Sequence, residues 1–130
     1  MVELSYHPVR HEISSLSRSV TVLTINNADS PVSDSFDMPL GIIDRVLIEF
    51  PRNCNRHIHI QIFQGSVQWL PGGSGSSFCL MGHEQPVGID CYKQVFDDDK
   101  NFIIRAWNDG DVHCNHIINI WFTVKFSEVV

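Results

Sequence analysis

Histidine and cysteine side chains gather at two places in the sequence, where they could hold a metal ion. His57 and His59 are alternate residues, so on a strand they would project from one face about 7 Å apart. Zinc and copper bind imidazole and thiolate groups. The candidate ligands are His57, His59, His113 and Cys114. Because their spacing matches no standard zinc module, we favour surface or interface histidines and expect no cofactor.

An acidic turn offers a second candidate cation site. Asp97, Asp99 and Asn101 occupy alternate positions, as the first ligands of an EF-hand calcium loop do. Phe102 stands where such a loop needs glycine, and Asn108 stands in place of its bidentate glutamate. We therefore expect a solvated acidic turn between two strands.

Motifs of catalysis are missing from the sequence. It contains no Gly-x-Ser-x-Gly elbow, no phosphate-binding loop and no carboxylate pair in a recognisable frame. The glycine- and serine-rich stretch 72–77 resembles a phosphate loop in composition, but no lysine follows it. We expect a flexible connector there and a protein that is not an enzyme.

Aromatic side chains are the best candidates for contacts with a partner. Trp121 shares a predicted strand face with Asn119, Thr123 and Lys125, where a monomer has little reason to place a large ring. Protein interfaces are enriched in such rings and depleted of lysine and glutamate. The predicted interface residues are Tyr6, Trp69, Trp107 and Trp121.

The same tryptophans allow a second reading. Trp69, Trp107 and Trp121 could stack against sugar rings, with polar groups beside them to bind the hydroxyls. The polar groups would be Asn108, Asp109 and Asp111. A carbohydrate-binding β-sandwich module is therefore the alternative function, and glycan the alternative ligand.

The composition describes an acidic chain that folds. Its 130 residues are 43% hydrophobic and 18% charged, which favours one folded domain over disorder. The net charge of -6 gives no electrostatic basis for binding nucleic acid or anionic membranes, so we expect neither partner. We expect a soluble protein, because no apolar run has signal-peptide or membrane-spanning length. Without a CxxC pair, the four cysteines are interpreted as mostly buried thiols.

Alternation of apolar and polar residues predicts an all-β fold. The pattern is clearest from His116 to Phe126 and recurs from Ile58 to Phe63, and no stretch shows helical periodicity. About eight short strands separated by turn residues indicate an antiparallel β-sandwich or jelly roll. The Asn-Asp-Gly-Asp turn at 108–111 predicts a hairpin of the last two strands. The predicted core residues are Ile48, Phe50, Ile58, Ile60, Ile62, Ile118, Ile120, Phe122 and Val124.

The first residues differ from the rest of the chain. Residues 1–18 are mainly polar and alternate only weakly, so we expect an extended N-terminal arm and a sandwich domain at 19–130. The arm would lie along its own sheet or be held by a neighbouring subunit.

Three segments, 39–51, 57–71 and 106–111 leading into His116, resemble small β-sandwich virion proteins of phages and environmental viruses. The resemblance covers roughly residues 39–126 and rests on strand and turn patterns. It implies a structural protein of the virion, as a capsid decoration or minor capsid subunit. Its partners would be other capsid subunits or further copies of this chain, in a homo-oligomer.

Overall fold

The chain folds into eight β-strands, as the sequence predicts. The computed structural model describes residues 9–52, 54, 56–79, 86–110 and 114–129, of which 9–12 and 127–129 by their backbone alone. Within these residues there is no helix, and so none that is long and apolar enough to cross a membrane. The strands are β1 (Val9–Val22), β2 (Val32–Asp37), β3 (Gly41–Glu49), β4 (Ile58–Gln64), β5 (Val67–Leu70), β6 (Val87–Val95), β7 (Asn101–Asn108) and β8 (His116–Val129).

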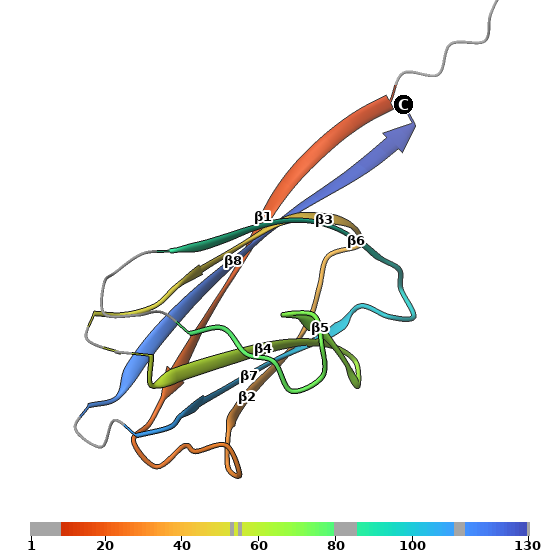
Figure 1. Ribbon diagram of the computed structural model, residues 1–130. Coiled ribbons are helices and arrows are strands. Elements are labelled where there is room, and N and C mark those ends of the chain that lie inside the picture. The colour runs from red at the N-terminus through yellow and green to blue at the C-terminus, as the bar shows by residue number, and fades with distance from the viewer. Residues whose placement is uncertain (1–8, 53, 55, 80–85, 111–113, 130) are drawn as a thin grey trace, which may run out of the picture.

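The strands form two antiparallel four-stranded sheets packed face to face (Figure 1). Sheet A has the order β1-β8-β3-β6 and sheet B the order β2-β7-β4-β5. Only β4 and β5 are both consecutive in sequence and paired; the other connections pass from one sheet to the other. This is the topology of a jelly roll, so the predicted fold class is confirmed.

The predicted hairpin between the last two strands is wrong. β7 pairs with β2 and β4 in sheet B, whereas β8 pairs with β1 and β3 in sheet A. Both strands carry an apolar face, with Ile104 on one and Ile120 on the other, and each face is fully buried. The two strands contribute these faces to opposite walls of the core, and the Asp-Gly turn does not by itself decide which sheet the next strand joins.

The core lies between the sheets and contains every residue predicted for it. The nine predicted side chains are each at most 2% exposed. Phe36 of β2 and Phe122 of β8 meet across the two sheets with ring centroids 5.7 Å apart. The alternation in the sequence thus corresponds to one apolar layer shared by both sheets.

One open edge of the sandwich is closed by an ion pair. Arg18 of β1 donates to both carboxylate oxygens of Asp34 of β2, at 2.7 and 2.6 Å. The guanidinium also lies 4.9 Å from the centre of the Phe36 ring. Two polar side chains therefore span the gap between the sheets while Arg18 covers the edge of the core.

Strand β1 extends across the expected boundary between arm and domain. It pairs with β8 from Val9 to Val22, so the described part of the arm lies along its own sheet. Leu16 packs against the core, and Val20 and Val22 are buried. The serines at 14, 15, 17 and 19 dilute the hydrophobic signal of this strand, which is why the sequence shows only weak alternation there.

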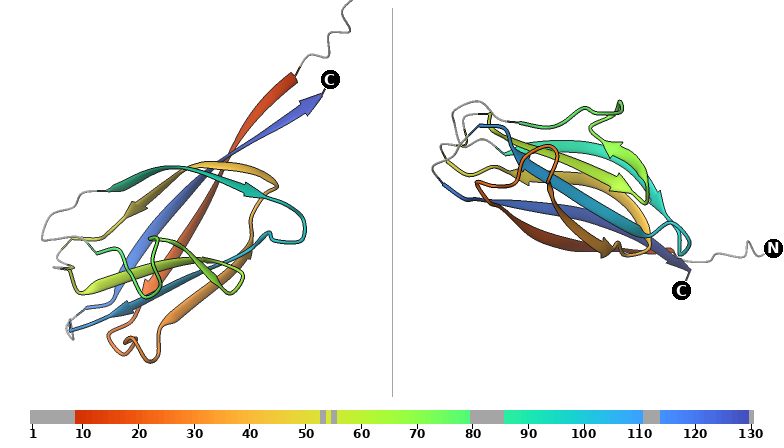
Figure 2. Two further views of the ribbon diagram at one scale, coloured as in Figure 1. Left: turned by 45° about the vertical axis from the view of Figure 1, so that its right-hand side comes forward. Right: turned by 90° about the horizontal axis from the view of Figure 1, so that it is seen from below.

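Strands β1 and β8 continue beyond the sandwich as a two-stranded ribbon (Figures 1 and 2). β3 pairs with β8 from Asn119 to Lys125. Past Lys125, Val9–Glu12 of β1 pair with Phe126–Val129 of β8, and no third strand of the described chain pairs with either. We call this segment, residues 9–12 with 126–129, the terminal ribbon.

The cysteines are less buried than expected. None forms a disulfide within the described part of the chain, and only Cys54 is buried. Cys79 and Cys91 are partly covered, and Cys114 is exposed. The expectation of mostly buried thiols is therefore wrong, although Cys91 packs against the core. Burial nonetheless raises the pKa of the Cys91 thiol, and the nearby carboxylates of Asp44 and Asp90 raise it further.

The core makes a direct prediction about stability. Replacing Phe122 with alanine removes a fully buried ring and should lower the free energy of unfolding by about 3–5 kcal/mol through lost transfer energy and the remaining cavity. Tyr92→Ala is the control, since Tyr92 is 75% exposed and its loss should change stability by less than about 0.5 kcal/mol. Urea unfolding followed by tryptophan fluorescence measures both; equal midpoints for the two variants would contradict this core.

Candidate functional site

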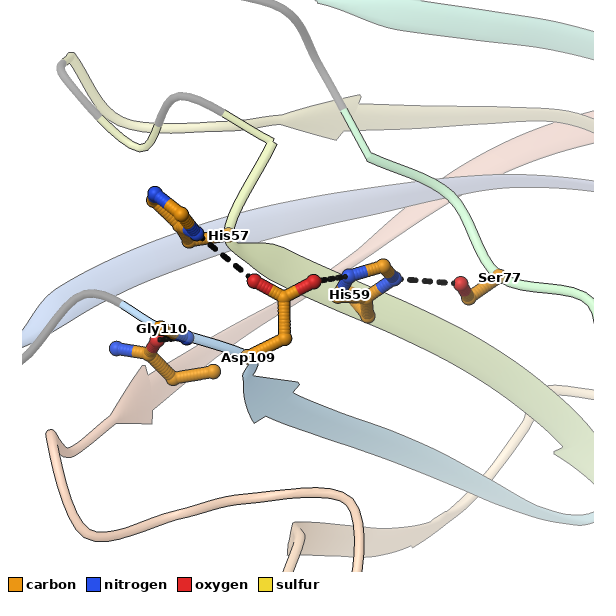
Figure 3. Close-up of polar contacts among 6 residues, drawn as sticks. His57, His59, Ser77, Asp109 and Gly110 are labelled. Carbon is orange, nitrogen blue, oxygen red and sulfur yellow. Dashed lines mark hydrogen bonds and ion pairs between the residues drawn. The ribbon is translucent and has the colours of Figure 1, made fainter.

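Two histidines and one aspartate meet at the end of sheet B (Figure 3). Nδ1 of His57 lies 2.8 Å from Oδ1 of Asp109, and Nε2 of His59 lies 2.5 Å from Oδ2. On its other side, Nδ1 of His59 lies 2.7 Å from Oγ of Ser77. We call these four residues the His-Asp cluster.

Strand register brings the histidines to the aspartate. β4 and β7 are paired so that Ile58 lies opposite Asn108 and His59 opposite Trp107. The pairing continues one step further, where the backbone N–H of Asp109 donates to the carbonyl of His57 at 2.8 Å. His57 and Asp109 therefore face each other across the last rung of the ladder.

The turn after β7 leaves space for the His57 ring. The backbone N–H of Gly110 donates to Oδ1 of Asn108 at 2.9 Å, which tightens the turn. A Cβ at position 110 would lie 3.2 Å from Nδ1 of His57. Glycine is thus the residue that lets the ring approach without displacement.

Ser77 reaches the cluster from a loop that folds back beside β4. The backbones of Ile60 and Phe78 exchange two hydrogen bonds, at 3.1 and 3.0 Å, which hold the end of the loop against the strand. Gln61 and Gln68 both donate to the carbonyl of Ser76. The stretch expected to be a flexible connector is therefore tied to sheet B by backbone and side-chain hydrogen bonds.

The proton positions follow from the charge of Asp109. An ionised carboxylate only accepts hydrogen bonds, so the histidine nitrogens that face it must carry hydrogen. Nε2–H of His59 then donates to Asp109, while Nδ1 of the same ring lies beside the Ser77 hydroxyl. The Trp107 ring stacks on His59, with centroids 5.3 Å apart and planes 5° from parallel, and fixes the orientation of the imidazole.

The environment of Asp109 favours its charged form. Partial burial raises the pKa of this carboxyl, but the hydrogen bonds from His57 and His59 and their charges together outweigh it. The net effect is a pKa below the ordinary value of 3.8. Asp109 is therefore an anion over the whole range from mildly acidic to basic pH.

The cluster contains the three groups of a serine, histidine and aspartate relay. In such a relay an imidazole oriented by a carboxylate accepts the hydroxyl proton as the oxygen attacks. Catalysis also needs a place for the substrate beside the hydroxyl. The hollow of about 430 Å³ at this end of the sheet is lined by Asn108, Asp109, Gly110 and residues of the 24–29 turn, without Ser77. The geometry better fits a structural contact, which we call a clamp, because the His-Asp cluster joins β4, β7 and the 71–78 loop.

The predicted metal ligands are brought together only in part. His57 and His59 share the carboxylate of Asp109, and Cys114 is exposed. His113 lies outside the described residues. Among the residues that are described, no group of three histidine, cysteine, aspartate or glutamate side chains is arranged to hold a metal ion.

The three predicted interface tryptophans lie in both sheets of the sandwich. Trp69 packs edge-on against Phe102, with centroids 5.7 Å apart, and helps to cover the core. Trp107 stacks on His59 in sheet B, whereas Trp121 is half-buried on β8 of sheet A, opposite Ser17 and Leu47. Tyr6 and Asp111 lie outside the described residues. The three tryptophans therefore do not form one platform for a sugar.

The acidic turn has local partners. Oδ1 of Asp99 accepts from the backbone N–H of Phe96, and Oδ1 of Asp97 accepts from Nζ of Lys100. Asn101 donates to Ser35 on the neighbouring strand β2. These three side chains point to different partners, as expected for a solvated turn.

Sequence reasoning missed the contribution of Ser77 and the central role of Asp109. Asp109 was expected only as a polar group beside a sugar, and Ser77 only as part of a connector. The Asp-Gly pair in the turn after β7 was visible in the sequence, but it did not show that His57 would lie beside it. Ser77 carried no signal of its own.

Comparisons with known proteins give a likeness of fold. No protein-family model matches the chain, and no curated protein matches it in sequence. Its fold is similar to a chain of the cyanophage Pam1 capsid asymmetric unit, with a TM-score of 0.46 and 14% sequence identity. That likeness covers 97% of this chain and 90% of the capsid chain. It gives no residue of this protein a role.

Asp109→Asn tests the clamp. The change keeps the shape of the side chain but removes the acceptor charge, and should lower the free energy of unfolding by about 1 kcal/mol at neutral pH, since the site is partly exposed. The folded-state pKa of Asp109 is lowered, so its contribution is complete above pH 3.8 and is lost as the pH falls further. The parent and variant should therefore converge in strong acid.

Urea unfolding at neutral pH and well below pH 3.8 measures both effects. Asp29→Asn is the matched control, because Asp29 lines the same hollow and no hydrogen bond to its carboxylate is present among the described residues. A constant difference between parent and Asp109→Asn at all pH values would contradict the assignment.

Proposed function

We propose that this protein is a non-enzymatic structural subunit of a virion, and that the terminal ribbon is its contact with neighbouring subunits. The observation that carries the proposal is the continuation of β1 and β8 beyond the sandwich, where no third strand of the described residues pairs with them. The partners are further copies of this chain or other capsid subunits.

The ribbon needs a partner for physical reasons. Two antiparallel strands alone are at best marginally stable in water, because they bury too little apolar surface. Both outer edges of the terminal ribbon present backbone N–H and C=O groups that are ready to pair with another strand. A strand from a neighbouring subunit would supply those hydrogen bonds.

Apolar side chains near the base of the ribbon add to this surface. Ile13, Leu40 and Phe96 are 66%, 49% and 53% exposed. Leu40 and Phe96 line a hollow of about 400 Å³ together with Phe126, the first ribbon residue of β8. A subunit that paired with the ribbon would cover this hollow, which favours association through the same end of the molecule.

The placement in a virion is supported by sequence and architecture. Residues 39–126 resemble small β-sandwich virion proteins, and jelly rolls are an architecture of viral capsid proteins and of lectins. The shared jelly-roll architecture is an analogy of fold, which does not by itself assign a function. The absence of enzymatic activity is proposed because the His-Asp cluster joins structural elements and Ser77 does not line the hollow beside Asp109.

Removing residues 1–12 tests the contact. This truncation deletes the β1 half of the terminal ribbon and keeps Leu16, Val20 and Val22, so the sandwich should remain folded while assembly weakens. Size-exclusion chromatography with light scattering measures the assembly, and thermal melting measures the fold. Deleting residues 1–18 is the comparison: it also removes Leu16 and Arg18, and should lower the melting temperature.

Two results would refute the proposal. One is a truncated chain that assembles as the full chain does, which would place the contact elsewhere. The other is a full-length chain that stays monomeric and is absent, by mass spectrometry, from purified particles of the virus that encodes it. Treatment with EDTA should leave the oligomer intact; dissociation in EDTA would instead favour a metal site at His57, His59, His113 and Cys114.

A further inference from the structure

The outer face of sheet B carries a second hollow, separate from the terminal ribbon. It has a volume of about 640 Å³ and lies between β4, β5, β7 and the loop after β5. This size is within the range of small-molecule sites. Its lining combines one basic group, polar groups and apolar groups: Arg105, Gln61, Ser66, Ser74, Phe63 and Val67.

Arg105 has no carboxylate partner among the described residues. Among the described residues its guanidinium has one contact, with the Phe63 ring, whose centre is 5.6 Å away. Four other basic side chains each pair with an aspartate at 2.6–3.0 Å, namely Arg18, Arg45, Lys100 and Lys125. The Arg105 guanidinium is therefore available to pair with an external anion, even in a chain with a net charge of -6. Its planar fork of donors matches a carboxylate.

The wall of the hollow is held in place by amide groups. Gln68 donates to the carbonyls of Pro71 and Ser76, and its Oε1 accepts from the Gly75 N–H and from Gln61. These bonds anchor the loop over sheet B. A site that is formed before binding loses less entropy when its ligand arrives.

Gln61 contributes the remaining acceptor. It is 7% exposed and lies directly opposite Arg105 in the β4–β7 ladder. Its Nε2 donates to Ser76 and Gln68, while its Oε1 accepts no hydrogen bond among the described residues. Gln61 and Arg105 therefore line the same hollow, together with Ser66 and Ser74.

We propose that this hollow binds an acidic saccharide, with Arg105 pairing the carboxylate of a uronic acid residue. A bare inorganic anion would use the guanidinium alone. A sugar acid also has hydroxyls for the Gln61 carbonyl and the two serines, and C–H faces for Val67, which is 69% exposed. The site requires neither the tryptophans nor the terminal ribbon.

A titration with matched small molecules tests the proposal. Methyl β-glucuronide, methyl β-glucoside and acetate are added separately to the ¹⁵N-labelled full-length protein, and backbone amide shifts are followed by NMR. The glucuronide should give saturable shifts centred on Gln61, Gly75 and Arg105. The glucoside, which lacks the carboxylate, and acetate, which lacks the sugar, should each bind at least about tenfold more weakly.

Variants separate the site from non-specific effects. Arg105→Gln should abolish the saturable shifts, and Arg105→Lys should weaken binding about tenfold because the fork of donors is lost. Arg45→Gln is the control, since Arg45 is an exposed arginine on sheet A, paired with Asp90, and should leave binding unchanged. An unchanged spectrum outside the site shows that each variant is folded.

Three outcomes would overturn the proposal. The first is the absence of saturable shifts with the glucuronide. The second is equal affinity for acetate, which would make the hollow a general anion site. The third is binding that survives in Arg105→Gln. None of these depends on whether the chain assembles through its ribbon, so the two proposals fail independently.

Discussion

Isoleucine and phenylalanine side chains from the two sheets meet in one apolar layer, and the outward direction of the polar side chains follows from it. In this layer the Phe36 ring lies 6.4 Å from that of Phe102 and 5.7 Å from that of Phe122, between ring centroids. Because successive strand residues point to opposite faces, burying this layer turns the polar set of every strand outward. A shift of one residue in the register of any strand would expose its apolar side chains and bury its polar ones.

The His-Asp cluster is a consequence of that register. Ile58, Ile60 and Ile62 are fully buried, so His59 must face outward, opposite Trp107 of β7. Asp109 then follows at the end of the same ladder and receives both histidines. The two histidines stabilise the Asp109 carboxylate as an anion, although the chain already carries an excess of acidic groups. Their hydrogen bonds to it hold the end of β4 to the end of β7, and the contact serves as a clamp in this way.

The proposed activities occupy different parts of one scaffold. The terminal ribbon is formed by the ends of the chain, at one end of the molecule (Figure 2). The hollow with Arg105 lies on the outer face of sheet B, over the middle of β4 and β7. Contact through the ribbon would therefore not by itself cover the hollow on the face of sheet B.

The sequence by itself determined the fold class and the core, because apolar alternation is a local property that each strand carries alone. The nine predicted core residues are buried for that reason. It did not determine which strands pair: the Asp-Gly turn predicted a hairpin, whereas β7 and β8 lie in different sheets. Pairing depends on how two apolar faces can be buried together, which involves residues far apart in the chain.

The same limit applies to the sites. His57 and His59 were visible as a pair, but Ser77 lies 18 residues from His59 and Asp109 lies 50 residues from it. Arg105 has no distinguishing neighbour in the sequence, and its lack of a carboxylate partner is a property of the folded surface. Tertiary structure alone decided these contacts, since hydrogen bonds and ion pairs depend on distances that only the packing of the two sheets sets.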